Sequence, residues 1–188
     1  MTSAATEGAR ERILRAAGEL FYGKGIRNVG IDEVIARAGV AKASLYKHFE
    51  SKDALILEWV RQQHEAWRDH WVAGVMARAD DARGRILGIF QELEESAIDD
   101  DLCRGCLFQN VMVELADAKH PAHQASVEHK RAMRGFIQQL CAEAGASDPE
   151  GLAYVLAMLH EGAIVAGVEE RSPEPARRAR EAAAQLLP

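Results

Sequence analysis

Apolar side chains recur along this chain at intervals of three and four residues, whereas the alternation typical of strands is not sustained. Such spacing gathers apolar groups on one face of an α-helix, so the pattern predicts an all-α fold. Gly23, Lys24 and Gly25 end the first stripe, and Gly39 ends the second, because glycine accepts the backbone that closes a helix. These two stripes are Ile13, Leu14, Ala17, Leu20 and Phe21, then Ile31, Val34, Ile35 and Ala38.

Helix-start signals divide the rest of the chain. Ser51 is suited to cap a helix whose first turn holds Asp53. That helix is expected to be long, because its stripe continues through Ile56, Val60, His64, Trp67 and Trp71. Further helices are predicted at 82–97, 106–117, 121–144, 148–169 and 174–187, where Pro121, Asp148 and Ser172–Pro173 mark starts.

The organisation predicted from these elements is two helical domains. Residues 1–53 form a small domain, of which 1–8 read as a flexible tail, and 54–188 form a larger one. The helix after Ser51 is the covalent bridge. Asp99–Asp101 with Arg104 and Gly105 read as a loop.

Residues 30–53 hold two short helices around Gly39, and the second has an unusual outer face. After Val40, the spacing points Ala41, Leu45 and Phe49 inward. The other side chains combine lysines, an aromatic ring, an imidazole and a hydroxyl, which suit DNA phosphates and base edges. They are Lys42, Ala43, Ser44, Tyr46, Lys47 and His48.

The stretches Ala38–Gly39–Val40, Ser44–Phe49 and Ser51–Leu55 resemble the N-terminal domain of the tetracycline-repressor (TetR) family in order and spacing. The resemblance covers residues 9–56 and includes a complete helix-turn-helix. It implies a three-helix DNA-binding domain followed by a larger helical ligand-binding and dimerisation domain. It also implies a non-enzymatic, one-component transcriptional regulator: a repressor that binds a pseudo-palindromic operator as a homodimer and is released by a small-molecule effector.

The family's DNA-contacting positions correspond here to Lys42, Ala43, Ser44, Tyr46, Lys47, His48 and Lys52. Lysines there would attract phosphates, Tyr46 would bond a phosphate, and Ser44 a base edge. Where the family usually places threonines before the first helix of the motif, this chain has Val29 and Gly30. Gly30 is then the expected, weaker N-cap.

Charge is distributed to match this organisation. The chain has a net charge of −6, yet residues 1–53 hold nine Lys and Arg against seven Asp and Glu. Residues 54–188 hold fourteen against twenty-two. An acidic body repels the phosphate backbone while a mildly basic head is attracted to it, which orients the molecule on a duplex.

Effector-lining candidates are bulky or polar side chains on inward faces of the larger domain. Side chains of this kind also form ordinary cores. Glu114 stands among Val111, Met112, Val113 and Leu115, so it requires a partner if it is buried and none if it faces solvent. The candidates are His64, Trp67, Trp71, Phe90, Phe108, Met112, Glu114, Met133, Tyr154 and Met158.

The last two long helices, 148–169 and 174–187, are the expected dimer contact. Resemblance assigns dimerisation to this region as a four-helix bundle with two helices from each chain. Small residues along the first of them allow close helix approach: Gly151, Ala157, Gly162, Ala163, Ala166 and Gly167.

The alternative from another class is a thiol- or metal-dependent redox protein or enzyme. It would use Cys103 and Cys106 with their CxxC spacing, and His120 and His123. Neither pair has a second ligand motif beside it, so no metal or cofactor is predicted. The stretch Gly151–Val168 is interrupted by His160 and Glu161 and reads as a buried helix rather than a span. A cytoplasmic location is expected.

Overall fold

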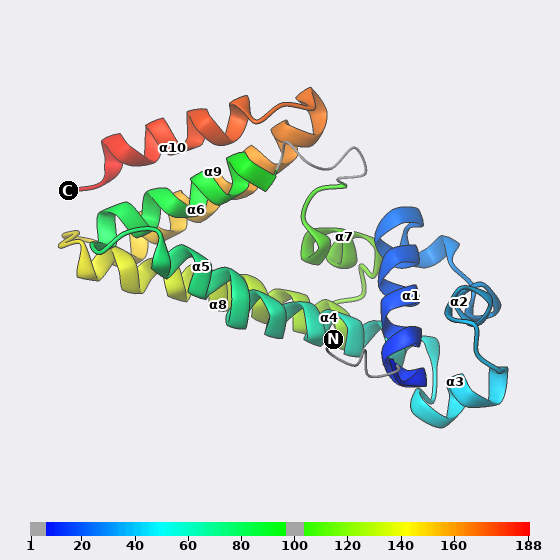
Figure 1. Ribbon diagram of the computed structural model, residues 1–188. Coiled ribbons are helices and arrows are strands. Elements are labelled where there is room, and N and C mark those ends of the chain that lie inside the picture. The colour runs from blue at the N-terminus through cyan, green and yellow to red at the C-terminus, as the bar shows by residue number, and fades with distance from the viewer. Residues whose placement is uncertain (1–6, 97–103) are drawn as a thin grey trace, which may run out of the picture. The chain divides into compact units, whose positions relative to one another are not determined.

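The computed structural model describes residues 7–96 and 104–188, and within those ranges the chain is helical without a strand, which confirms the all-α prediction (Figure 1). The N-terminal elements are α1 (Ala9–Lys24), the 3₁₀ turn η1 (Ile26–Asn28), α2 (Ile31–Ala38), α3 (Lys42–His48) and α4 (Lys52–Ala66). The remainder are the π turn η2 (Trp67–Trp71), α5 (Val72–Ala77), α6 (Ala82–Ser96), α7 (Leu107–Glu114), α8 (Pro121–Glu143), α9 (Pro149–Glu170) and α10 (Glu174–Leu186).

One predicted helix boundary is wrong. The helix expected at 106–117 ends at Glu114, because a turn built around Asp117 follows it. The Asp117 carboxylate accepts a hydrogen bond from the Lys119 N–H at 2.9 Å, and its carbonyl accepts one from the His120 N–H at 2.9 Å. These bonds offer the backbone an alternative to the helix. The Asp99–Asp101 segment lies outside the described residues.

The chain divides into two compact units. The first unit comprises residues up to Gln63 together with Asn110–Ser126, and the second comprises His64–Gln109 and Val127–Pro188. The first unit therefore includes most of α4, the C-terminal five residues of α7 and the beginning of α8.

The first unit is built on the apolar face of α1. Ile13, Ala17 and Phe21 are buried, with α2 and α3 packed against this helix. Trp59 of α4 meets the Phe21 ring edge-on at 5.6 Å between ring centroids. Helix α2 ends at Gly39, as predicted, with the left-handed backbone φ 62° and ψ 43°. There the Val40 N–H donates to the Ile35 carbonyl, and the Gly39 N–H donates to the Ala36 carbonyl.

The bridge helix is continuous from α4 through η2 into α5, as its stripe predicted. Ser51 caps its start, since its hydroxyl accepts the Ala54 N–H at 3.1 Å. The segment Trp67–Trp71 is a π turn, in which the backbone bonds span one residue more than in an α-helix. Trp67 and Trp71 stack on each other there, with ring centroids 6.0 Å apart.

The second unit buries an apolar core between its helices. Ile86 and Phe90 of α6, Ile137 of α8 and Leu156 of α9 are among its fully buried side chains. The helix α10 packs against both α9 and α6 (Figure 1).

The helix α9 is only partly the buried helix that the sequence predicted. Its buried side chains are Ala153, Leu156, His160 and Ala163, and the opposite face is exposed. By length and composition it is apolar enough to cross a membrane, a property that core helices of soluble proteins share. The exposed apolar face of α9 is therefore a candidate surface for contact with another chain.

Candidate DNA interface and effector site

The exposed face of α3 has the side chains that the sequence predicted. Leu45 and Phe49 are buried, at 0% and 5% exposure, which fixes the orientation of the helix. Ala41 is exposed rather than inward, because it precedes α3 and its carbonyl accepts the N–H groups of Ser44 and Leu45. On the outer side, Lys42, Ala43, Tyr46, Lys47 and His48 are exposed and Ser44 is half-buried.

Lys42 begins this face with its charge already paired. Its Nζ lies 3.0 Å from Oδ1 of Asp32 in α2, and this carboxylate raises the pKa of Lys42. Both side chains are exposed, so the contact contributes little to stability. A phosphate approaching Lys42 competes with Asp32.

Lys52 differs from the other predicted DNA contacts, because its ammonium points into the first unit. It donates a hydrogen bond of 2.6 Å to the carbonyl of Ile26 and lies 5.9 Å from the Phe21 ring centroid. Partial burial lowers the pKa of Lys52, and the charges of Asp53 and Glu114 oppose that shift. Its assignment to a phosphate stays a prediction.

Glu114, a candidate effector residue, lies in the first unit and has a backbone partner. Its Oε2 accepts the N–H of Arg27 at 3.0 Å. Met112 also belongs to the first unit.

An aromatic and histidine cluster lies within the second unit. Nδ1 of His64 is 3.1 Å from Nδ1 of His129, so one imidazole donates and the other accepts. Phe108 stacks on His129 with centroids 3.4 Å apart. The Trp67 ring centroid lies 5.5 Å from that of His64 and 5.0 Å from that of His129. Trp71 stacks on Trp67.

Burial favours the neutral form of two histidines in this unit, His129 and His160. Desolvation, followed by the charges of His64 and Lys130, lowers the pKa of His129 to about 3. Desolvation and Lys130 lower the pKa of His160 to about 4. His160 meets the Phe90 ring edge-on at 6.2 Å.

Two buried nitrogens here have no hydrogen-bond partner within the described part of the chain. They are Nε1 of Trp67, which can only donate, and Nδ1 of His160, which donates or accepts according to its tautomer. An unsatisfied buried polar group costs free energy, about 1–3 kcal/mol. A bound molecule with complementary groups would recover that cost.

Of the sequence candidates, His64, Trp67, Trp71 and Phe108 belong to this cluster, while Phe90 and Met133 belong to the apolar core of the same unit. Sequence reasoning missed His129 and His160. Their signal was their spacing: His129 follows Ala122 and Ser126 and precedes Met133 on one face of α8. His160 stands four residues after Leu156 in the same way.

Tyr154 and Met158 are not in the cluster, because they lie on the exposed face of α9 at 53% and 55% exposure. Val155 and Val165 are exposed beside them, at 38% and 52%. A shallow apolar hollow continues this face onto α10, lined by Val155, Met158, Leu159, Gly162, Ala163, Ala166, Pro175, Arg178, Ala179 and Ala182. We call this surface the α9–α10 face.

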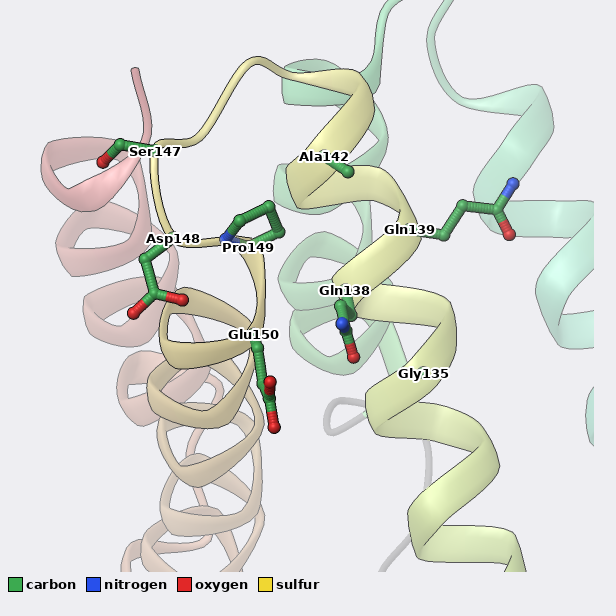
Figure 2. Close-up of a pocket in the computed structure, with 8 residues that line it drawn as sticks. All are labelled: Gly135, Gln138, Gln139, Ala142, Ser147, Asp148, Pro149 and Glu150. Atoms are coloured by element: carbon green, nitrogen blue, oxygen red, sulfur yellow. The ribbon is translucent and has the colours of Figure 1, made fainter.

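A second hollow lies at the end of α8 and the start of α9 (Figure 2). Its polar side chains do not converge: Gln139 points away from Glu150, and the carboxylate of Asp148 caps α9 by accepting the Gly151 N–H at 2.9 Å. This arrangement carries no recognisable chemistry.

The redox or metal alternative is not favoured. Cys103 lies outside the described residues, and Cys106 and Cys141 are thiols. Nδ1 of His120 accepts the Ala122 N–H at 3.2 Å, and Nδ1 of His123 bonds Leu115 O at 2.8 Å, so both imidazoles serve the turn before α8. Across residues 7–96 and 104–188, no three His, Cys, Asp or Glu side chains are grouped to hold a metal.

Comparison with known proteins finds two family domains in order along the chain. Residues 13–59 match the family described as bacterial regulatory proteins, tetR family, and residues 82–183 match the tetracyclin repressor-like C-terminal domain. The transcriptional regulator LmrA of Bacillus subtilis is 30% identical over 173 residues, which are 89% of this chain and 90% of LmrA. The regulator YjdC of Escherichia coli is 25% identical over 95% of this chain and 93% of its own length.

Solved structures give the same result. The TetR-family transcriptional regulator SCO4454 from Streptomyces coelicolor superposes with a TM-score of 0.87 at 32% identity, covering 95% of each chain. Escherichia coli NemR in its reduced form has a TM-score of 0.85 at 22% identity, over 96% of this chain and 98% of NemR, which is a likeness of fold. With both domain matches in chain order and an exposed reading helix in the first, the chain belongs to the TetR family and is a DNA-binding transcriptional regulator.

Proposed function

We propose that the protein is a cytoplasmic, non-enzymatic repressor that binds a pseudo-palindromic operator as a homodimer and is released by a small-molecule effector. The observation that carries DNA binding is the outer face of α3, where lysines, an imidazole and a phenol are exposed on a helix anchored by Leu45. Two such helices related by a dimer axis require half-sites roughly 34–36 Å apart or a little more.

The α9–α10 face supports the homodimer. It groups exposed apolar side chains with small residues such as Gly162 and Ala166, which allow helices to approach closely. An apolar surface of this kind is costly in water and marks an interaction site. A second copy of the chain supplies a complementary face by symmetry.

The aromatic and histidine cluster supports the effector class. Burial lowers the pKa of His129 to about 3, so this imidazole offers no charge to an anionic ligand, while the indole rings favour a planar apolar molecule. The unpaired Nε1 of Trp67 requires an acceptor. We therefore propose an uncharged, planar effector that has a carbonyl or similar acceptor group.

Selection of bound sites from random DNA, followed by a screen of compounds for release, tests this function. A compound that releases the operator is expected to change the fluorescence of Trp67 and Trp71, because it packs against their rings. Trp59, the third tryptophan of the chain, lies in the first unit. In the Trp59→Phe variant all tryptophan fluorescence therefore comes from Trp67 and Trp71. Release without any change in that variant's fluorescence would place the effector elsewhere.

Lys47→Ala is expected to weaken binding to all DNA sequences and to reduce the slope of log affinity against log salt by about one unit. The reason is that an exposed lysine on α3 neutralises one phosphate and releases its counterion. Operator titrations at several salt concentrations measure the slope. Lys119→Ala removes an exposed lysine outside α3 and serves as the control. Equal slopes in the two variants would contradict the assignment of Lys47.

A further inference from the structure

The turn between α1 and α2 is held by charged side chains from two other elements of the first unit. The Glu114 carboxylate at the end of α7 accepts the Arg27 N–H at 3.0 Å. From the start of α4, Lys52 donates to the Ile26 carbonyl at 2.6 Å. The turn thus has one backbone donor and one backbone acceptor bound by ions of opposite charge.

Gly25 permits this approach. Its φ is 89°, a backbone angle that residues other than glycine rarely adopt. A Cβ at this position would lie 3.2 Å from both oxygens of the Glu114 carboxylate. A side chain at position 25 would therefore crowd the Glu114 carboxylate. The hydrogen bond between Glu114 and Arg27 joins residues 87 positions apart in the sequence.

The held turn leads directly into the DNA-reading motif. Val29, which follows η1, is 1% exposed, and Gly30 then begins α2. The helix α2 passes through the Gly39 turn to α3, so the position of η1 determines where both helices of the motif begin. A side chain that holds η1 therefore helps to orient the reading helix.

We propose that Glu114 is a positioning residue for DNA binding, which holds η1 and with it α2 and α3 in the orientation that binds the operator. The same helix also contributes to the proposed effector site: Phe108, six residues before Glu114, stacks on His129 in the second unit. The two positions are about 9 Å apart along α7. Because a hydrogen bond fails beyond about 3.5 Å, a shift of α7 by about 1 Å would break the bond from Glu114 to η1 and leave Lys52 to hold the turn. This regulatory step rests on the proposed function.

The test compares Glu114→Ala and Glu114→Gln with the parent protein on its selected operator. Glu114→Ala is expected to weaken operator binding by about tenfold, or about 1.4 kcal/mol, because the variant lacks the carboxylate that accepts the Arg27 N–H. Glu114→Gln keeps an acceptor without charge and is expected to fall between the two. The control Glu128→Gln removes an exposed carboxylate of α8 and should bind as the parent does.

A readout independent of DNA is the amide proton of Arg27 in the NMR spectrum. Loss of a carboxylate acceptor moves this resonance upfield in Glu114→Ala, less in Glu114→Gln, and not in Glu128→Gln. An unchanged Arg27 resonance in Glu114→Ala overturns the contact, and parent-like operator affinity in that variant overturns its role. A parent protein that binds no DNA would instead contradict the proposed function, while the Arg27 resonance still tests the contact.

Transmission through α7 is tested by Phe108→Ala in two backgrounds. If α7 carries the signal, Phe108→Ala weakens operator binding in the parent but adds little in Glu114→Ala, because the contact it disturbs is already missing. Independent losses that multiply in the double variant would overturn the transmission.

Discussion

Met158→Arg is expected to make the protein monomeric and to lower operator affinity by about 10²- to 10⁴-fold, the range in which linked binding sites gain over single ones. Met158 lies at the exposed centre of the α9–α10 face, and arginines from two symmetric copies would bring like charges together in an apolar contact. Light scattering measures the mass of the protein in solution. Titration with full operator and with a half-site measures the loss of affinity.

The matched control is Met76→Arg, which introduces the same group at a methionine of α5 that is 36% exposed and lies outside that face. It should remain dimeric with parental operator affinity. A dimeric Met158→Arg protein would rule out the α9–α10 face as the dimer contact. A monomer that keeps full operator affinity would refute the requirement for a dimer.

Acidification from pH 7.5 to pH 5.5 is expected to lower the free energy of unfolding of the second unit by about 3 kcal/mol. His129 and His160 have folded pKa values of about 3 and about 4, below the ordinary value of 6.5. Between pH 6.5 and the folded pKa values, these two histidines therefore bind protons in the unfolded chain but stay neutral in the folded chain. Each histidine contributes full stability above pH 6.5 and loses about 1.4 kcal/mol per pH unit below it.

This window separates the histidines from the paired carboxylates. Glu19, Glu95 and Glu174 have pKa values lowered from 4.5 by arginine partners, so their contributions are lost only at more acidic pH. Urea denaturation at pH 7.5 and 5.5 measures the difference. His129→Gln and His160→Gln should each remove about half of it. A pH dependence that both variants retain in full would contradict the assignment.

The helices were predictable from sequence because their signals are local. Asp148 caps α9 by accepting a hydrogen bond from Gly151, three residues away, and Gly39 closes α2 within a single turn. The early end of α7 was not predictable, because the residues after Glu114 can either continue the helix or form a turn around Asp117. Periodicity extended the helix past Glu114, whereas the hydrogen bonds of Asp117 form a turn.

The side chains proposed to bind DNA were more predictable than those proposed to bind the effector, because local spacing determines the former and distant contacts the latter. The outer face of α3 follows from the spacing of Leu45 and Phe49 on one short helix. The inward turn of Lys52 does not, because its acceptor is the carbonyl of Ile26, 26 positions earlier. The assignment of α3 side chains to DNA rests on exposure and family resemblance and stays a prediction.

The histidines of the second unit depend on contacts that no short window contains. His64 and His129 are 65 positions apart and pair at 3.1 Å, with His129 buried and His64 half-buried. Tyr154 and Met158 illustrate the converse. Their helical spacing is that of a core stripe, but in α9 the side chains buried within one chain are Ala153, Leu156, His160 and Ala163. The exposed apolar face that we propose as the dimer contact therefore has the same sequence pattern as a core.

The pairing of Lys42 with Asp32 bears on how the protein searches a genome. An unpaired lysine adds to the attraction for any phosphate, and so to the time spent on the great excess of irrelevant sequence. Lys42 must exchange one anion for another, so its gain on random DNA is small. The exchange becomes favourable only where α3 also fits the bases. If Lys42 contacts a phosphate as proposed, we expect Asp32 to lower binding to random DNA more than binding to the operator. Removal of Asp32 is then expected to raise affinity for DNA in general and to reduce selectivity.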